Sequence, residues 1–172
     1  MKPKPPTALR WVWLSALVVL LDRITKTLAV EYLVLNAPMP QFPGLNLTLV
    51  HNPGAAFSLL RYAGGWQRWV FIVLAAVIAA GILAWLWRLP ARRKWLACAL
   101  ALVMGGALGN LWDRVTLGYV IDFIDVYYAH SHWPAFNLAD SAITVGAVML
   151  VIDAFWFDRA EVSFNDGGRR DG

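Results

Sequence analysis

Long apolar stretches recur along this sequence, and short polar segments separate them. A bilayer core needs about 20 mostly apolar residues per helix, and four stretches approach that length: about 11–30, 68–88, 95–112 and 137–157. No charged residue lies between Trp69 and Trp87, whereas Asp22, Arg23 and Lys26 interrupt the first stretch. The pattern predicts a membrane all-α fold, a four-transmembrane-helix bundle that forms one domain over all 172 residues.

The segments between these stretches predict a small extracytoplasmic β-sheet. The longer segment, about 31–67, contains the alternating run Leu45-Asn46-Leu47-Thr48-Leu49-Val50, which is typical of a strand. The shorter segment, about 113–136, contains Gly118 and many aromatic residues, which suit an interfacial segment. We expect the sheet and a loop at the outer membrane interface, and a cytoplasmic tail over 158–172.

Composition supports a membrane protein. Hydrophobic residues make up 59% of the chain and charged residues 15%, against roughly 25% charged residues in a typical soluble domain. These values argue against a disordered chain and against an ordinary water-soluble enzyme. Cys98 is the only cysteine, so an intrachain disulfide is excluded.

Lysine and arginine predict the orientation, because cytoplasmic loops carry an excess of both. Ten of the 15 fall in the N-terminal segment, in the connection 88–94 or in the C-terminal tail, and five fall elsewhere. We therefore expect both termini and this connection in the cytoplasm. The net charge of +4 is then a sign of topology, and we expect no nucleic-acid partner.

A cleaved signal peptide is an alternative interpretation of residues 1–30, since Lys2, Lys4 and Arg10 precede an apolar stretch of 11 residues. No convincing small-x-small cleavage site follows that stretch, and the charges at 22, 23 and 26 would be unusual before one. We therefore expect a retained helix.

Polar residues gather at the external ends of the predicted spans. Ionisable groups within spans are costly and are usually functional or paired. Segments far apart in the sequence bring polar groups, most of them ionisable, to one depth: Asp22, Lys26, Asn110, Asp113, Arg114, Asp122, Asp125 and Asp140. This convergence indicates a site at the outer membrane interface.

Helical spacing predicts two local arrangements in this set. Asp22 and Lys26 are four residues apart, so they share a helix face and can form an ion pair, which is either structural or lines the site. Glycines in a small-xxx-small pattern, Gly105 and Gly109, allow another helix to approach closely. Beside them, one turn apart, lie three further residues: Gly106, Asn110 and Arg114. They predict a packing seam capped by an ion pair of Arg114 with Asp113, which could support a site without performing chemistry.

Asp122 and Asp140 are candidate catalytic residues, because neither has a basic residue within one turn and both belong at the same depth. Asp140 begins a helix, where the N-terminal partial positive charge favours a carboxylate. Two carboxylates held close together cannot both ionise cheaply, so one keeps a proton near neutral pH. Such a pair offers a base for water and an acid for the leaving group. Two unrelated interfacial aspartates are the alternative, and Asp125 is a rival partner.

Other chemistries have weaker signals. Ser58 and His51 share the longer external segment, but no buried aspartate or nucleophile elbow accompanies them. His130 and His132 with Asp125 form only a weak metal motif, and solvated loop histidines explain them better. The sequence contains no P-loop and no dinucleotide fingerprint, and we expect neither a metal nor a cofactor.

Five motifs in order resemble the signal peptidase II (lipoprotein signal peptidase) family. The resemblance covers about residues 10–157, on the motifs D-R-I-T-K at 22–26, N-P-G-A-A-F-S at 52–58, G-G-A-L-G-N-L-W-D-R at 105–114, V-I-D-F at 120–123 and F-N-L-A-D-S at 136–141. One departure is Arg23, where glutamine is more usual after the aspartate.

The resemblance implies a membrane aspartyl endopeptidase of the bacterial inner membrane, with its site on the periplasmic side. Such an enzyme cleaves the signal peptide from prolipoproteins just before a diacylglyceryl-modified cysteine. The family's catalytic pair falls on Asp122 and Asp140, and its substrate-contacting loop falls on Asn52 and Gly54. Its remaining motif positions, which shape and support the site, fall on Asp22, Lys26, Asn110, Asp113, Arg114 and Asn137.

The expected partners are lipid-modified prolipoproteins, membrane lipids and globomycin-type inhibitors, and we expect a monomer. A substrate that carries two acyl chains would enter from the lipid, and an external sheet could hold its extended peptide by strand addition. The chief alternative is a small proton-coupled transporter, since carboxylates inside spans also relay protons. However, transporters favour midplane sites and repeated halves, which this sequence lacks. A non-catalytic scaffold would leave the aspartates unexplained.

Overall fold

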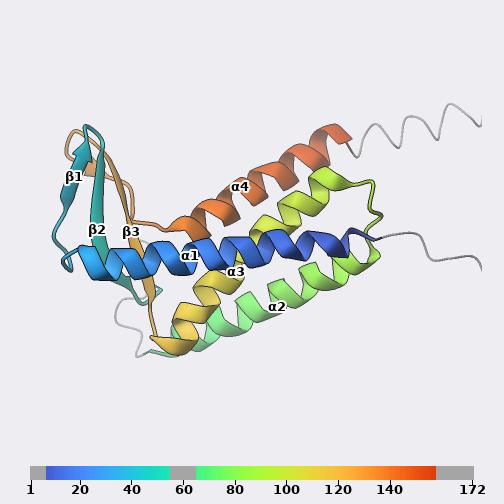
Figure 1. Ribbon diagram of the computed structural model, residues 1–172, viewed down its shortest axis with the longest axis horizontal. Helices are drawn as coiled ribbons and strands as arrows, with labels where there is room; N and C mark the ends of the chain where they lie inside the picture. The colour runs from blue at the N-terminus through green and yellow to red at the C-terminus, as the bar shows by residue number, and fades with distance from the viewer. Residues whose placement is uncertain (1–6, 55–64, 158–172) are drawn as a thin grey trace, which may run out of the picture.

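A computed structural model of the chain describes residues 7–54 and 65–157, and Figure 1 shows helices with a small sheet at one end. The elements are a 3-10 turn η1 (Ala8–Trp11), α1 (Val12–Tyr32), β1 (Met39–Phe42), β2 (Leu45–Asn52), α2 (Trp66–Arg88), α3 (Lys94–Thr116), β3 (Val120–Tyr128), β4 (Ser131–His132), α4 (Leu138–Ile152) and a π turn η3 (Asp153–Phe157). The expected helical fold with a small sheet is confirmed. Ser58, part of the motif at 52–58 and the tail over 158–172 lie outside the described residues.

Three of the described helices are long and apolar enough to cross a bilayer: α2, α3, and α4 with its π turn as far as Trp156. α1 has 21 residues and is nearly as long. However, Asp22, Arg23 and Lys26 interrupt its apolar composition. Length and composition therefore identify three spans, and the fourth stays a prediction.

α3 is the central helix, since α1, α2 and α4 all pack against it. The predicted glycine seam produces this packing. A Cβ on Gly105 would lie 2.7 Å from the Val18 Cβ and 2.9 Å from the Ser15 carbonyl oxygen, so only glycine lets α1 come this close. The Ser15 hydroxyl donates a 2.7 Å hydrogen bond to the Ala101 carbonyl oxygen of α3.

The sheet is antiparallel, with strand order β1-β2-β3-β4. The predicted strand at 45–50 is confirmed as the main part of β2. In the register of β2 with β3, Asn46 faces Asp125 and Val50 faces Asp122. β3 lies where we expected an interfacial segment. Its run of β-branched and aromatic residues suits a half-buried strand, although it lacks a simple polar–apolar alternation.

The end of the bundle opposite the sheet is closed by the connection between α2 and α3 (Figure 1). The Ala8 amide donates a 2.8 Å hydrogen bond to the Leu89 carbonyl oxygen, so the start of the described chain lies beside this connection. Arg93 and Asp153 form an ion pair of 2.8 Å at the same end. Two segments predicted to be cytoplasmic therefore lie together.

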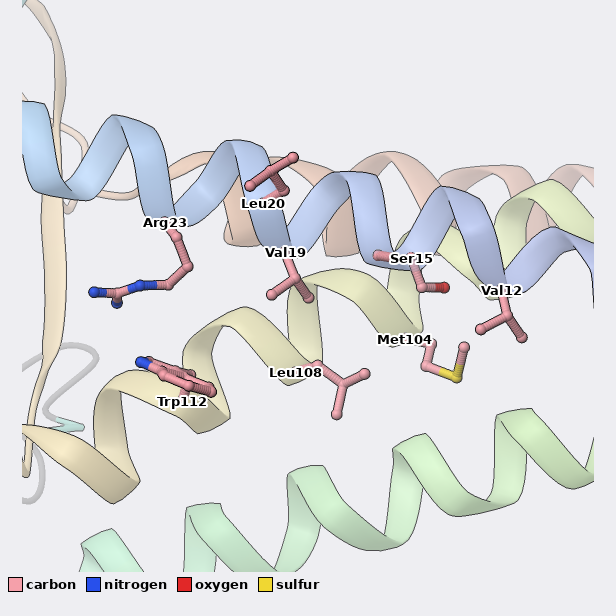
Figure 2. A pocket seen from close by; sticks show the side chains of 9 residues that line it. Val12, Ser15, Val19, Leu20, Arg23, Met104, Leu108 and Trp112 are labelled. Atoms are coloured by element: carbon pink, nitrogen blue, oxygen red, sulfur yellow. The ribbon is translucent and has the colours of Figure 1, made fainter.

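A groove runs between α1 and α3 (Figure 2) and encloses a cavity of about 450 Å³. Its wall is formed by Val12, Ser15, Ala16, Val19, Leu20 and Arg23 of α1, and by Met104, Leu108 and Trp112 of α3. On both helices the spacing is three or four residues, so each helix presents one face to the groove.

Gly105→Ala is expected to destabilise the protein, because its added Cβ would overlap Val18 and the Ser15 backbone. Overpacking of this kind costs about 1–3 kcal/mol, so the thermal midpoint in detergent should fall. Gly81→Ala on α2 is the matched control, because an added Cβ there meets nothing within 4 Å. Alanine is favoured in a helix by roughly 0.5–1 kcal/mol, so this control should not lose stability. Equal losses in both variants would contradict the close approach of α1 and α3.

Candidate active site

The buried ammonium group of Lys26 holds together the ends of α1 and α3 that lie next to the sheet. It forms ion pairs of 2.8 Å with Asp22 and of 2.8 Å with Asp113, and donates a 3.0 Å hydrogen bond to Asn110 Oδ1. The side chains of Lys26, Asp22 and Asp113 are all 0% exposed. The predicted pair of Asp22 with Lys26 is confirmed, and it extends to a second carboxylate on another helix.

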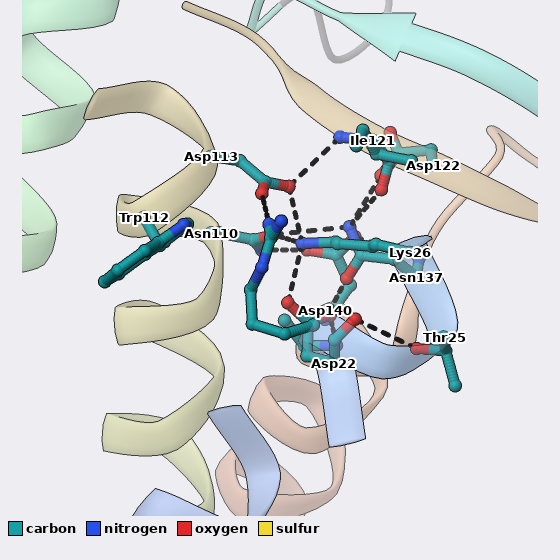
Figure 3. A network of polar contacts seen from close by, with 12 residues as sticks. Asp22, Thr25, Lys26, Asn110, Trp112, Asp113, Ile121, Asp122, Asn137 and Asp140 are labelled. Carbon is teal, nitrogen blue, oxygen red and sulfur yellow. Dashed lines mark hydrogen bonds and ion pairs between the residues drawn. The ribbon is translucent and has the colours of Figure 1, made fainter. Parts of the chain in front are cut away.

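The two carboxylates bonded to Lys26 also bind the backbone of the segments that carry the catalytic candidates. Asp22 Oδ1 accepts a 3.0 Å hydrogen bond from the Ala139 amide in the first turn of α4, and Asp113 Oδ2 accepts one of 3.2 Å from the Ile121 amide in β3. Figure 3 shows this network between the helix ends and the strand. The ion cluster thus positions the neighbours of Asp140 and Asp122.

Asp140 lies in the first turn of α4, as predicted, and its side chain is fixed by a capping box. Asn137 Oδ1 accepts a 2.9 Å hydrogen bond from the Asp140 amide, and Asp140 Oδ2 accepts one of 3.2 Å from the Asn137 amide. The other carboxylate oxygen, Oδ1, accepts a 2.7 Å hydrogen bond from Asn110 Nδ2. These bonds fix the positions of both carboxylate oxygens of Asp140.

Asp122 lies on β3 with its side chain directed toward the helix ends (Figure 3), and it is 1% exposed. Its Oδ1 accepts a 2.7 Å hydrogen bond from Asn137 Nδ2, and its Oδ2 accepts one of 2.8 Å from Asn52 Nδ2. Burial raises the pKa of Asp122 to about 7, and the nearby charge of Asp140 adds to the rise. The hydrogen bonds from Asn52 and Asn137 and the charge of Lys26 lower the pKa, but by less than burial raises it. This group therefore exchanges its proton near neutral pH.

Asn137 connects the two catalytic candidates. It donates to Asp122 through its side chain and exchanges two hydrogen bonds with Asp140, and it is fully buried. Its Nδ2 also lies 3.2 Å from Asn110 Oδ1, which accepts in turn from Lys26. The structure thus brings Asp122 and Asp140 into one network, with a proton-exchanging carboxyl beside a second carboxyl.

Asn52 and Gly54 lie at the end of β2, next to Asp122. The Gly54 amide donates a 2.9 Å hydrogen bond to Asn52 Oδ1, which orients the amide that binds Asp122. Gly54 has φ of +102°, and a Cβ there would lie 2.6 Å from the Phe71 ring. Glycine is therefore required at this turn.

Gly106 and Arg114 complete the predicted supporting set. A Cβ on Gly106 would overlap the Ala139 carbonyl oxygen, so this glycine lets α4 approach α3. Arg114 Nη1 donates a 3.2 Å hydrogen bond to the Asn110 carbonyl oxygen, and its guanidinium lies 4.9 Å from the centre of the Phe71 ring. The expected ion pair of Asp113 with Arg114 is not what the structure shows: Asp113 binds Lys26 and Arg23 instead.

Asp125, the rival partner, has different contacts. It lies three residues beyond Asp122 on the same strand, so the two side chains leave opposite faces. Its carboxylate accepts a 2.8 Å hydrogen bond from Asn46 and lies 2.8 Å from His132 Nδ1. Within the part of the chain that the structure describes, no three potential metal ligands gather around these groups.

Several contacts of this region were not predicted from the sequence, among them the two that follow. Arg23 Nη1 binds Asp113 Oδ1 across the ends of α1 and α3, and Asn46 binds Asp125 across the sheet. The position of Arg23 beside Asp22 was the only sequence signal for the first contact. The pairing of β2 with β3, which would have given the second, depends on a strand that we did not predict.

Comparison with known proteins identifies relatives of this chain. The family model for signal peptidase (SPase) II matches residues 14–156. A lipoprotein signal peptidase of Acinetobacter baumannii is 50% identical over 161 residues, which are 94% of this chain and 92% of that protein. A lipoprotein signal peptidase of Teredinibacter turnerae is 54% identical over 150 residues, which are 87% of this chain and 89% of that protein.

A solved structure supports the same relationship. A bacterial membrane enzyme determined by the in meso method at 1.9 Å resolution superposes with a TM-score of 0.72 at 27% sequence identity. The match covers 86% of this chain and 93% of that one. The arrangement of helices and sheet is therefore one that an experimentally determined membrane enzyme shares.

Lys26→Met is expected to destabilise the protein by about 3–5 kcal/mol, because it leaves Asp22 and Asp113 buried without their shared cation. Thermal unfolding in detergent measures this loss. The exposed Lys94 gives the matched control, since Lys94→Met should change stability by no more than about 0.5 kcal/mol. Adding Asp22→Asn to Lys26→Met should restore part of the loss, because it removes one uncompensated charge. If Lys26→Met were as stable as Lys94→Met, the ion cluster would not hold the helix ends.

Proposed function

This chain belongs to the signal peptidase II family, whose members are proteases of lipoprotein processing, and we propose that it cleaves diacylglyceryl-modified prolipoproteins just before the lipidated cysteine. In this proposal Asp122 and Asp140 activate the attacking water, which makes the protein an aspartic endopeptidase. The observation that carries the proposal is the network through Asn137, which joins two carboxyl groups, one of them with its pKa raised to about 7.

The proposed reaction needs one proton on the pair. The ionised carboxylate takes a proton from water, and the oxygen of that water attacks the scissile carbonyl carbon. The protonated carboxyl donates a hydrogen bond to the developing tetrahedral oxygen and helps to deliver a proton to the leaving nitrogen, so the peptide C–N bond breaks. Water is the nucleophile, so no covalent acyl-enzyme forms, and no step requires a metal or cofactor.

The side chains around the pair have supporting roles in this proposal. Asn52 and Gly54 lie where β2 ends beside Asp122, so a substrate peptide extended along this edge would pass the pair. Hydrogen bonds between backbones would hold it, as in strand addition. Arg114, Asn110 and Asn137 shape the surroundings of Asp122 and Asp140. The ion cluster of Lys26 fixes the segments that carry this pair.

We propose that α1 is a fourth span, in an inner membrane with both termini cytoplasmic and the site on the periplasmic side. Three charged groups of α1, Asp22, Arg23 and Lys26, turn toward α3, and Lys26 and Asp22 are fully buried. Many of its exposed large side chains are apolar, among them Leu20, Leu21 and Leu28, and the charged Glu31 is exposed only in its last turn. The helix therefore presents an apolar surface to lipid although its sequence is interrupted by charges.

The proposed partners follow from the proposed reaction. Lipid-modified prolipoproteins enter from the bilayer, since each buried methylene of an acyl chain contributes about 0.8 kcal/mol. Globomycin-type inhibitors would occupy the same site, and the enzyme would act as a monomer among membrane lipids.

Replacement of either member of the pair should abolish activity. Asp122→Asn and Asp140→Asn are each expected to lower cleavage of a purified diacylglyceryl-modified preprotein in detergent by at least about 100-fold, with the thermal midpoint retained. Asp125→Asn is the matched control and should keep substantial activity, because Asp125 binds Asn46 and His132. Near-normal turnover of Asp122→Asn or Asp140→Asn would refute the assignment of these two residues as the catalytic pair. Total loss of activity in Asp125→Asn would restore Asp125 as a candidate.

The pH dependence of cleavage should report the raised pKa of Asp122. Below about pH 7 the pair keeps its proton, and above it the proton leaves, so kcat/KM should fall as the pH rises through about 7. The titration belongs to the pair as a unit. Asn52→Ala removes a hydrogen bond that favours the ionised form, so this falling limb should move to higher pH.

Asn46→Ala is the control for that shift, because Asn46 binds Asp125 and not Asp122. The falling limb of kcat/KM in the Asn46→Ala variant should stay at the same pH as in the wild-type chain, even if the value of kcat/KM changes. A limb that moved equally in both variants, or that moved to lower pH in Asn52→Ala, would contradict the assignment of the proton to this pair.

A further inference from the structure

The groove between α1 and α3 has the dimensions of a lipid chain in one leaflet. On α1 it extends from Val12 to Arg23, which is about 16 Å at 1.5 Å per helical residue. The hydrocarbon core of a bilayer is about 30 Å thick, so the groove is about as long as one leaflet is deep. Its end at Arg23 is the end that faces the sheet (Figure 2).

The interior of the groove offers contacts to apolar groups only. Val19 and Leu108 face each other across it (Figure 2). The Ser15 hydroxyl, its one polar side-chain group away from the ends, already donates to the Ala101 carbonyl oxygen. A ligand in this part of the groove must therefore be a hydrocarbon chain.

The outer end of the groove is cationic. The cluster next to it contains two cations and two carboxylates, so its formal charges balance. However, Asp22, Lys26 and Asp113 have 0% exposed side chains, whereas the side chain of Arg23 is 31% exposed. Arg23 is therefore the one member of the cluster that is accessible from the groove.

Arg23 has donors to spare at this position. Its contact with Asp113 uses Nη1, and a guanidinium carries five N–H donors in a fixed fork. The indole nitrogen of Trp112 points toward the same end of the groove (Figure 2). A phosphate there would accept charge-assisted hydrogen bonds from Arg23, which are among the strongest in proteins.

We propose that this groove binds an anionic phospholipid, with one acyl chain between Val19 and Leu108 and its phosphate at Arg23 and Trp112. Basic pockets between membrane helices recognise anionic head groups in this way. A diacylglycerol would fill the apolar part but would have no phosphate for Arg23, so the charge favours the phospholipid. None of the groove residues bonds Asp122 or Asp140, so this site does not rest on the proposed reaction.

Native mass spectrometry of the full chain in detergent tests the proposal, with phosphatidylglycerol and a diacylglycerol of the same acyl chains as probes. The wild-type chain should retain one phosphatidylglycerol in preference to the diacylglycerol. Arg23→Gln should weaken phosphatidylglycerol binding by about tenfold, the loss of one charged hydrogen bond, and leave diacylglycerol binding unchanged. Val19→Trp fills the groove while it keeps Arg23 and Asp113 paired, so it should abolish retention of both lipids.

Val77→Trp is the matched control, because Val77 lies on the lipid-facing surface of α2 and is 63% exposed. It should bind phosphatidylglycerol like the wild-type chain. Retention in Val19→Trp equal to that of this control would overturn the proposal. Equal binding of diacylglycerol and phosphatidylglycerol would overturn recognition of the phosphate, and a shift to a lipid-free dimer would assign the groove to a second copy of the chain.

Discussion

The arrangement of this site depends on a single buried ammonium group. Lys26 lies between carboxylates from α1 and α3, and those carboxylates bind the backbones of α4 and β3. Taking such charges out of water is costly, and a buried ion cluster is often no more stable than a packed apolar one. We infer that the cluster serves to fix the positions of the helix and strand ends, because each carboxylate can form all of its bonds in one arrangement of those ends only.

The catalytic candidates use that geometry in different ways. Asp140 is held within a helix cap by its bonds with Asn137, and Asn110 binds its other oxygen. Asp122 is held on a strand, where burial opposes its charge and amide donors from Asn52 and Asn137 support it. The two carboxyl groups are thus held in different surroundings, one in a helix cap and one on a buried strand, within one network through Asn137.

The sequence allowed prediction of those features that depend on local spacing. The ion pair of Asp22 with Lys26 and the close approach at Gly105 follow from one turn of a helix, and the strand at 45–50 follows from alternation. The partners of Asp113 could not be predicted, because they depend on how α1 rotates against α3. The bond of Asn46 with Asp125 could not be predicted either, because predicting it requires knowing the register in which β2 pairs with β3.

If α1 spans the bilayer, as we propose, it shows why counting charges along a chain is a poor measure of a membrane helix that also builds a site. Its buried charged side chains, Lys26 and Asp22, lie inward in the cluster, while leucines such as Leu20 and Leu28 are exposed. In the proposed orientation lipid would meet the outward face, and the cost of the buried charges is offset by the pairing of Lys26 with Asp22 and with Asp113 of α3. What decides whether such a helix can span a bilayer is therefore the partner that each charge finds, and for α1 every buried charge has one.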